Sequence, residues 1–206
     1  SVVAGSGTIV VTVAAGLIGA IVESGADAGV DLSGATIDLN GDTGIGAIGN
    51  ALEIAATTIS ADNTTSGVIN LGNTSGAAAT ATSLTTITGD ITFTQTGGGS
   101  LTVTLATTTT SGDIAITNDG ALTVTTATAG GAGAGNGDIT LTSTGTGNNV
   151  NVDSVTALGD TVTVTSGGAI EESGADAAAD IVAATIDLNA STGVGTLATL
   201  EITGTT

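Results

Sequence analysis

The feature that most constrains this chain is a short motif, marking the start of a strand, that recurs along the middle of the sequence. The copies read SGVINL, TGDITFT, SGDIAIT, NGDITLT and LGDTVTVT, and their glycines are 22, 23, 25 and 22 residues apart. Each interval also holds a second strand-like run, such as SLTVTL or ALTVTTA. A period near 22 residues with two or three short strands is typical of one coil of a β-solenoid.

Apolar and polar residues alternate within these runs, as in Ile91-Thr-Phe93 and Leu101-Thr-Val103. A period of two directs one set of side chains inward and the other outward. Val, Ile and Thr favour strands because they branch at Cβ. Gly-Asp and Asn-Gly pairs suit the turns between strands. We therefore predict an all-β fold, a parallel β-helix of about nine coils of roughly 22 residues, forming a single β-solenoid segment over residues 1–206.

A longer repeat joins the two ends of the sequence, because residues 1–54 resemble residues 154–202. Residues 19–46 align with residues 168–195 at an offset of 149, with 19 of 28 positions identical. After one deletion, the tripeptide Leu-Glu-Ile at 52–54 meets the same tripeptide at 200–202. The chain thus holds about one and a third units of a repeat of roughly 150 residues, the pattern expected of a window from a tandem array.

The composition excludes many functions. The chain has 19 Asp and Glu residues but no Lys, Arg, His or Cys, so its formal net charge is −19. Those absences rule out a Ser-His-Asp triad, a Schiff-base lysine, a zinc finger and a disulfide framework, and we predict that the chain is not an enzyme. Without cationic side chains we expect no nucleic-acid binding. Cations should instead gather around the chain as counterions.

One apolar stretch, Thr8 to Val22, is long enough to suggest a signal segment or a short membrane span. It lacks a positively charged flank, so we predict no membrane insertion. Disorder is also disfavoured, since only 9% of the residues are charged while 40% are hydrophobic.

Acidic residues gather in two turn-like segments that occupy matching positions in the long repeat. Because no basic side chain can pair with them, these carboxylates must be solvated or must meet a metal ion. Their spacing matches neither an EF-hand nor the nonapeptide Ca²⁺ repeat. Ca²⁺ is the one cofactor we consider, with solvated turn charges as the alternative. The candidate ligands are Glu23, Asp27, Asp31, Glu172, Asp176 and Asp180.

The runs GDITLTS, GDTVTVTSGGAI and ATIDLNASTGVG, with the TLEI near the end, resemble a known group of repeats. They are similar to the repeats of large bacterial filamentous-haemagglutinin-like adhesins and β-strand-repeat surface exoproteins. The resemblance implies a right-handed parallel β-helix, export to the cell surface, and a stalk, adhesin or matrix role. Such repeats usually carry some Lys and Arg, and this chain departs from them in having none.

Taken together, these features predict a structural protein of the cell surface or extracellular space. Exposed coil ends are edges prone to pairing, so we expect the chain to associate with itself end to end and form a stiff rod or filament. One alternative is an adhesin passenger or stalk. Another is an ice-binding solenoid, suggested by the threonine-rich runs, although the sequence shows no Thr-x-Thr position shared by every coil.

Overall fold

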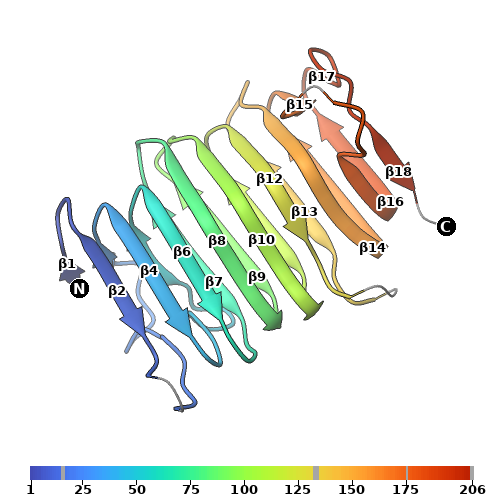
Figure 1. Cartoon of the computed structure of the whole chain (residues 1–206). Coiled ribbons are helices and arrows are strands. Elements are labelled where there is room, and N and C mark those ends of the chain that lie inside the picture. Colours follow the sequence, from blue (N-terminus) through green and yellow to red (C-terminus); the bar gives the residue numbers. More distant parts are fainter. Residues whose placement is uncertain (15–16, 132–134, 175, 205–206) are drawn as a thin grey trace.

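The computed structural model describes residues 1–14, 17–131, 135–174 and 176–204, and shows strands joined by turns (Figure 1). None of these described residues lies in a helix long and apolar enough to cross a membrane. The strands are β1 (Val2–Val3), β2 (Thr8–Thr12), β3 (Leu32–Ser33), β4 (Thr36–Gly41), β5 (Leu52–Ala55), β6 (Thr58–Asn63), β7 (Ile69–Thr74), β8 (Ala79–Thr88), β9 (Ile91–Thr96), β10 (Leu101–Ser111), β11 (Ile114–Asn118), β12 (Leu122–Thr128), β13 (Ile139–Ser143), β14 (Val150–Ser166), β15 (Ala169–Glu172), β16 (Ile181–Ala190), β17 (Gly193–Val194) and β18 (Ile202–Gly204).

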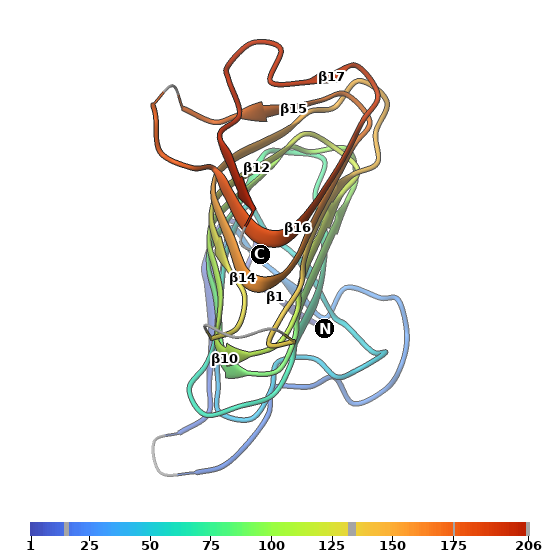
Figure 2. The same cartoon turned by 90° about the vertical axis from the view of Figure 1, so that its right-hand side faces the viewer.

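The strands pair in parallel, most of them with the strand two places further along the chain. Thus β8 pairs with β10 and β10 with β12 on one wall, while β9 pairs with β11 and β11 with β13 on the other. Figure 2 looks along this stack and shows the chain winding around an elongated cross-section. The fold is a parallel β-solenoid, which confirms the predicted fold class.

The number of coils is smaller than predicted, about seven turns instead of nine. One column of inward side chains marks the turns, since each member is the register partner of the next. The estimate of nine failed because loops lengthen several coils and irregular segments take up both ends. The column contains Ile21, Ile45, Ile69, Ile91, Ile114, Ile139, Val162 and Ile186.

A second column lies beside the first and holds the only aromatic residue, Phe93. Its register partners are Leu71 in β7 and Ile116 in β11, and all three side chains are fully buried. Because adjacent coils stack about 4.8 Å apart, each rung of such a column contacts the rungs above and below it. The core is therefore a narrow stack of aliphatic side chains, as the alternating pattern indicated.

Polar side chains also form a buried column along one corner of the solenoid. Asn73 donates a hydrogen bond to Gln95 Oε1 (2.8 Å), and Gln95 in turn donates to the Gly99 carbonyl (3.0 Å). Further along the column, Asn118 donates to the Ala121 carbonyl at 2.8 Å. These bonds satisfy carbonyl groups of the turns, which would otherwise be costly to bury. The column contains Asn73, Gln95, Asn118, Ser143 and Ser166.

The aspartates of the strand-start motif link successive turns. The Asp113 N–H donates to Asp90 Oδ1 (3.0 Å) and the Asp138 N–H donates to Asp113 Oδ1 (2.9 Å). The Thr161 N–H continues the series by donating to Asp138 Oδ1 at 2.8 Å. Each carboxylate therefore accepts a backbone hydrogen bond from the next coil, which explains why aspartate recurs at this position.

The two copies of the long repeat share their strand pairings. Thr8 is the register partner of Thr36, and Thr161, its counterpart in the second copy, is the partner of Thr185. Likewise, Leu32 pairs with Ile54 and Ile181 pairs with Ile202. One local structure is therefore built twice, close to each end of the stack.

Candidate functional site

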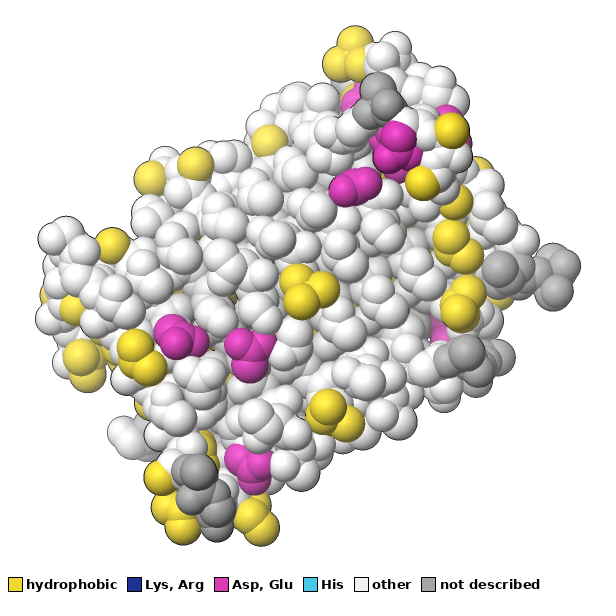
Figure 3. Space-filling view, viewed as in Figure 1, with side chains coloured by type: hydrophobic (Ala, Val, Ile, Leu, Met, Phe, Trp, Pro, Cys, Tyr) yellow, Lys and Arg dark blue, Asp and Glu magenta, His cyan; other side chains and the backbone are white. Residues whose placement is uncertain are grey.

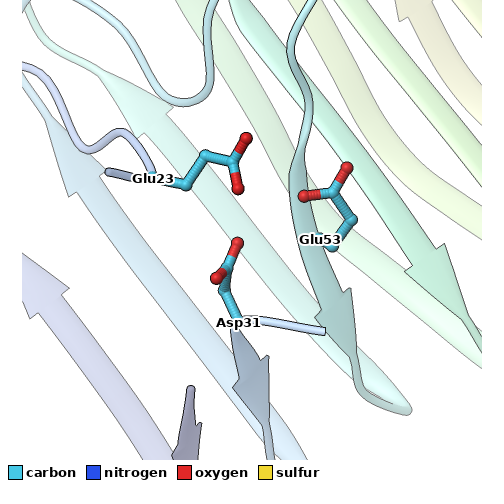
Figure 4. Close-up of side chains that lie close together, drawn as sticks. All are labelled: Glu23, Asp31 and Glu53. Atoms are coloured by element: carbon cyan, nitrogen blue, oxygen red, sulfur yellow. The ribbon is translucent and has the colours of Figure 1, made fainter. Parts of the chain in front are cut away.

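The first candidate site is a group of three carboxylates near the amino-terminal end of the solenoid, here called the first triad. It contains Glu23, Asp31 and Glu53, each with an oxygen within 4.8 Å of an oxygen of the others. Asp31 directly precedes β3 and Glu53 lies in β5, and the Asp31 N–H donates to the Glu53 carbonyl (2.8 Å). Figure 4 shows the three side chains pointing toward one another.

The second triad contains Glu172, Asp180 and Glu201 and lies near the carboxyl-terminal end. These residues occupy the positions of the first triad in the long repeat. The Asp180 N–H donates to the Glu201 carbonyl and the Glu201 N–H donates to Asp180 Oδ2, both at 2.8 Å. The solenoid thus presents the same arrangement of carboxylates twice.

Four of the six predicted ligands are brought together in these triads, and Asp27 and Asp176 lie outside them. Asp27 Oδ1 instead accepts a hydrogen bond from the Gly29 N–H, and Asp176 Oδ1 accepts one from the Ala178 N–H, both at 2.6 Å. Each of these two carboxylates therefore stabilises the turn that contains it.

Sequence reasoning missed one member of each triad, Glu53 and Glu201. The signal was present in the long repeat, which aligns the two Leu-Glu-Ile tripeptides. Alternation along β5 buries Leu52 and Ile54 and leaves Glu53 only partly covered, on the opposite face of the strand. Only the pairing of adjacent coils brings that carboxylate next to Asp31.

Burial makes both triads electrostatically unfavourable when all members are charged. In the described part of the chain, Glu23 Oε1, Asp31 Oδ2 and Glu53 Oε2 are buried atoms without a hydrogen-bond partner. Burial, followed by the repulsion of Glu23, raises the pKa of Glu53. In the second triad, Asp180 is only 2% exposed, and burial together with the nearby carboxylates of Glu172 and Glu201 raises its pKa to about 6.

Glu171, the neighbour of the second triad, is also buried but is well paired. It accepts hydrogen bonds from the Thr196 hydroxyl and from the Leu197 N–H, the latter at 3.0 Å. Burial alone would raise the pKa of Glu171, but these hydrogen bonds outweigh it and lower the pKa. The contrast shows that the triads stand out because donors are missing, not merely because acids are buried.

Three converging carboxylates can relieve their repulsion by taking up a proton or a cation. Hard divalent ions such as Ca²⁺ bind six to eight oxygen ligands, and carboxylates together with main-chain carbonyls and water can supply them. No basic side chain exists in this sequence to serve instead. Ca²⁺ binding therefore stays a prediction, now with Glu23, Asp31 and Glu53 as one ligand set and Glu172, Asp180 and Glu201 as the other.

The raised pKa of Asp180 predicts that the folded chain loses stability as the pH rises. The pKa moves from an ordinary value of 3.8 to about 6, so between these values the folded state holds a proton that the unfolded state has released. Stability is then greater near pH 5 than near pH 7.5, by a contribution on the order of 2 kcal/mol without divalent ions. Urea unfolding at both pH values, in the presence of a chelator, measures the difference.

Two variants separate this contribution from the general relief of negative charge in acid. Asp180→Asn should reduce the difference between the two pH values, because the amide does not titrate. Asp176→Asn removes an exposed carboxylate and should leave the difference close to that of the parent chain. Equal pH dependence in all three proteins would show that Asp180 does not titrate with a raised pKa.

Comparisons of the chain with protein-family models, with curated proteins and with solved structures each found no match. The fold itself therefore defines the class: the chain is a β-solenoid repeat protein.

Proposed function

We propose that this chain is a structural building block of an extracellular or cell-surface filament, formed by coils of neighbouring copies stacking end to end. The observation that carries the proposal is the distribution of exposed large apolar side chains. Most of them lie in the end coils, and few lie on the walls between. At the amino-terminal end they are Val2, Val3, Leu17, Ile18 and Val22, and at the other end Val194, Leu197 and Ile202.

The backbone at both ends supports the same proposal. Within the described residues, β2 pairs only with β4, and residues 185–190 of β16 pair only with β14. Unpaired N–H and C=O groups at such edges favour the addition of another strand. An open hollow of about 230 Å³ at the amino-terminal end is lined by Val2, Val11 and Ile21, among others. An incoming coil could fill this hollow with its own apolar rung.

The size of the molecule explains why stacking matters. About seven turns at roughly 4.8 Å span only about 34 Å, which is too short for a rod on its own. A head-to-tail contact does not close on itself and therefore lengthens without limit. The resemblance to bacterial surface exoproteins favours a stalk or matrix role rather than catalysis. The absence of Lys and Arg also leaves no trypsin site, which suits exposure outside the cell.

Negative-stain electron micrographs of the purified chain, with Ca²⁺ and with a chelator, test the proposal. We expect fibres one solenoid wide. Ile202→Asp places a charge on the exposed end coil and should abolish them, whereas Leu158→Asp, at a partly exposed position of β14, should not. Fibres that disappear on chelation would indicate that the triads bind Ca²⁺ at the contact. Single short particles under both conditions would contradict stacking.

A further inference from the structure

One wall of the solenoid carries threonines in register from coil to coil. Six of them form a row in which each residue is the register partner of the next. The row consists of Thr8, Thr36, Thr58, Thr80, Thr102 and Thr123. A second, shorter row follows two residues later in three adjacent strands and consists of Thr82, Thr104 and Thr125.

The two rows together make a regular array of Thr-x-Thr units on β8, β10 and β12. The residue between the two threonines is Ala81, Val103 or Val124, and each of these is fully buried. The threonines therefore stand on the outer face, about 4.8 Å apart along the stack and about 6.7 Å apart along each strand. Branching at Cβ restricts the rotation of their side chains. Hydroxyl and methyl groups are thus held in a fixed two-dimensional pattern.

The array is free of charge although the chain is strongly acidic. The strands β8, β10 and β12 contain no Asp or Glu, whereas the whole chain contains 19. Figure 3 shows the face formed by these strands, which is uncharged over most of its centre, with acidic side chains toward its margins. A cation would find no ligand charge here.

The hydroxyls of the array are also available to solvent. Among the described side-chain hydrogen bonds, none involves Thr102, Thr104, Thr123 or Thr125, while Thr82 donates to the Ile59 carbonyl of the preceding coil (3.0 Å). A free threonine hydroxyl can both donate to and accept from water. The methyl group beside each hydroxyl limits the positions that water can occupy.

We propose that this threonine face binds the surface of an ice crystal. Ice is an uncharged, flat and periodic lattice whose exposed molecules both donate and accept hydrogen bonds, and the array offers the same properties. The backbone ladders set the positions of the side chains before binding, so little conformational entropy is lost. The proposal does not depend on end-to-end stacking, although stacking would lengthen the array.

The opposite wall provides a matched control. Its outward rows include Thr94, Thr117 and Thr142 in β9, β11 and β13, but the neighbouring row is interrupted by Ala115. The variant T104K/T125K places two bulky cations on the proposed face, in adjacent coils. The variant T117K/T142K places the same charges in adjacent coils of the opposite wall. Both variants change the net charge equally, so only the location differs.

Thermal hysteresis and the growth of ice grains in frozen solution measure the activity, with circular dichroism to verify the fold. The parent chain and T117K/T142K should both be active, and T104K/T125K should lose activity while folded. If the lysines disturb folding, Thr104→Val, which removes only a hydroxyl, should reduce the activity instead. An inactive parent chain, or equal losses in both double variants, would overturn the proposal. Dimers broken only by T104K/T125K, with no effect on ice, would assign the face to a second copy.

Discussion

Replacing Phe93 by alanine should lower the free energy of unfolding by about 3–5 kcal/mol, the range for large aromatic side chains deleted from a packed core. Phe93 is fully buried and is the only aromatic residue of the chain. Its rung lies between Leu71 and Ile116, whose positions are set by backbone pairing in register. Those neighbours cannot move into the space left behind without breaking the ladder, so we expect a persistent cavity.

Equilibrium unfolding in urea measures this loss, and Phe93→Leu is the matched control. Leucine restores most of the volume and matches the aliphatic rungs above and below, so it should cost less than about 1.5 kcal/mol. Solenoids can unfold in parts, so the denaturant dependence should be compared among the three proteins. A loss near 1 kcal/mol or less for Phe93→Ala would show that this rung is not packed as described.

The inward side of the fold could be predicted from the sequence because it depends on local pattern. Alternation placed Ile91, Phe93 and Val103 in the core, and all three are fully buried. The recurring glycine motif predicted parallel coils. What failed was the count, because a period measured between motifs ignores loops such as the segment between β2 and β3. Those loops change the length of a coil without changing the stacking of its strands.

The surface patterns could not be predicted because they depend on register between coils. The threonines of the longest row are separated by as many as 28 residues, between Thr8 and Thr36, and by as few as 21, between Thr102 and Thr123. A fixed period therefore scatters a row that pairing aligns. Glu53 was missed in the same way, since its contact with Asp31 exists only across two coils. Side chains that meet between coils require the pairing, whereas those that face the core require only the alternation.

The recurring glycine has a stronger reason for its conservation of position along the solenoid than the turn alone. Gly67 has a φ of +95°, which other residues rarely adopt, and a Cβ atom at this position would overlap with the Thr43 carbonyl oxygen of the preceding coil. The same crowding recurs at Gly89, where a Cβ would lie 2.7 Å from the Gly67 carbonyl. Glycines of successive coils therefore stack directly on one another's backbone.

Gly67→Ala should consequently destabilise the chain by at least about 3 kcal/mol, since it adds steric overlap to the strain of the left-handed backbone. Gly98→Ala is the control: Gly98 has a similar φ of +81°, but no atom lies within 4 Å of the position its Cβ would occupy. That variant should lose only about 1–2 kcal/mol, the cost of the backbone conformation alone. Urea unfolding of both variants separates the two causes. Equal losses would mean that the glycine is required only for the turn, and that the coils do not approach as closely as the stacked backbone indicates.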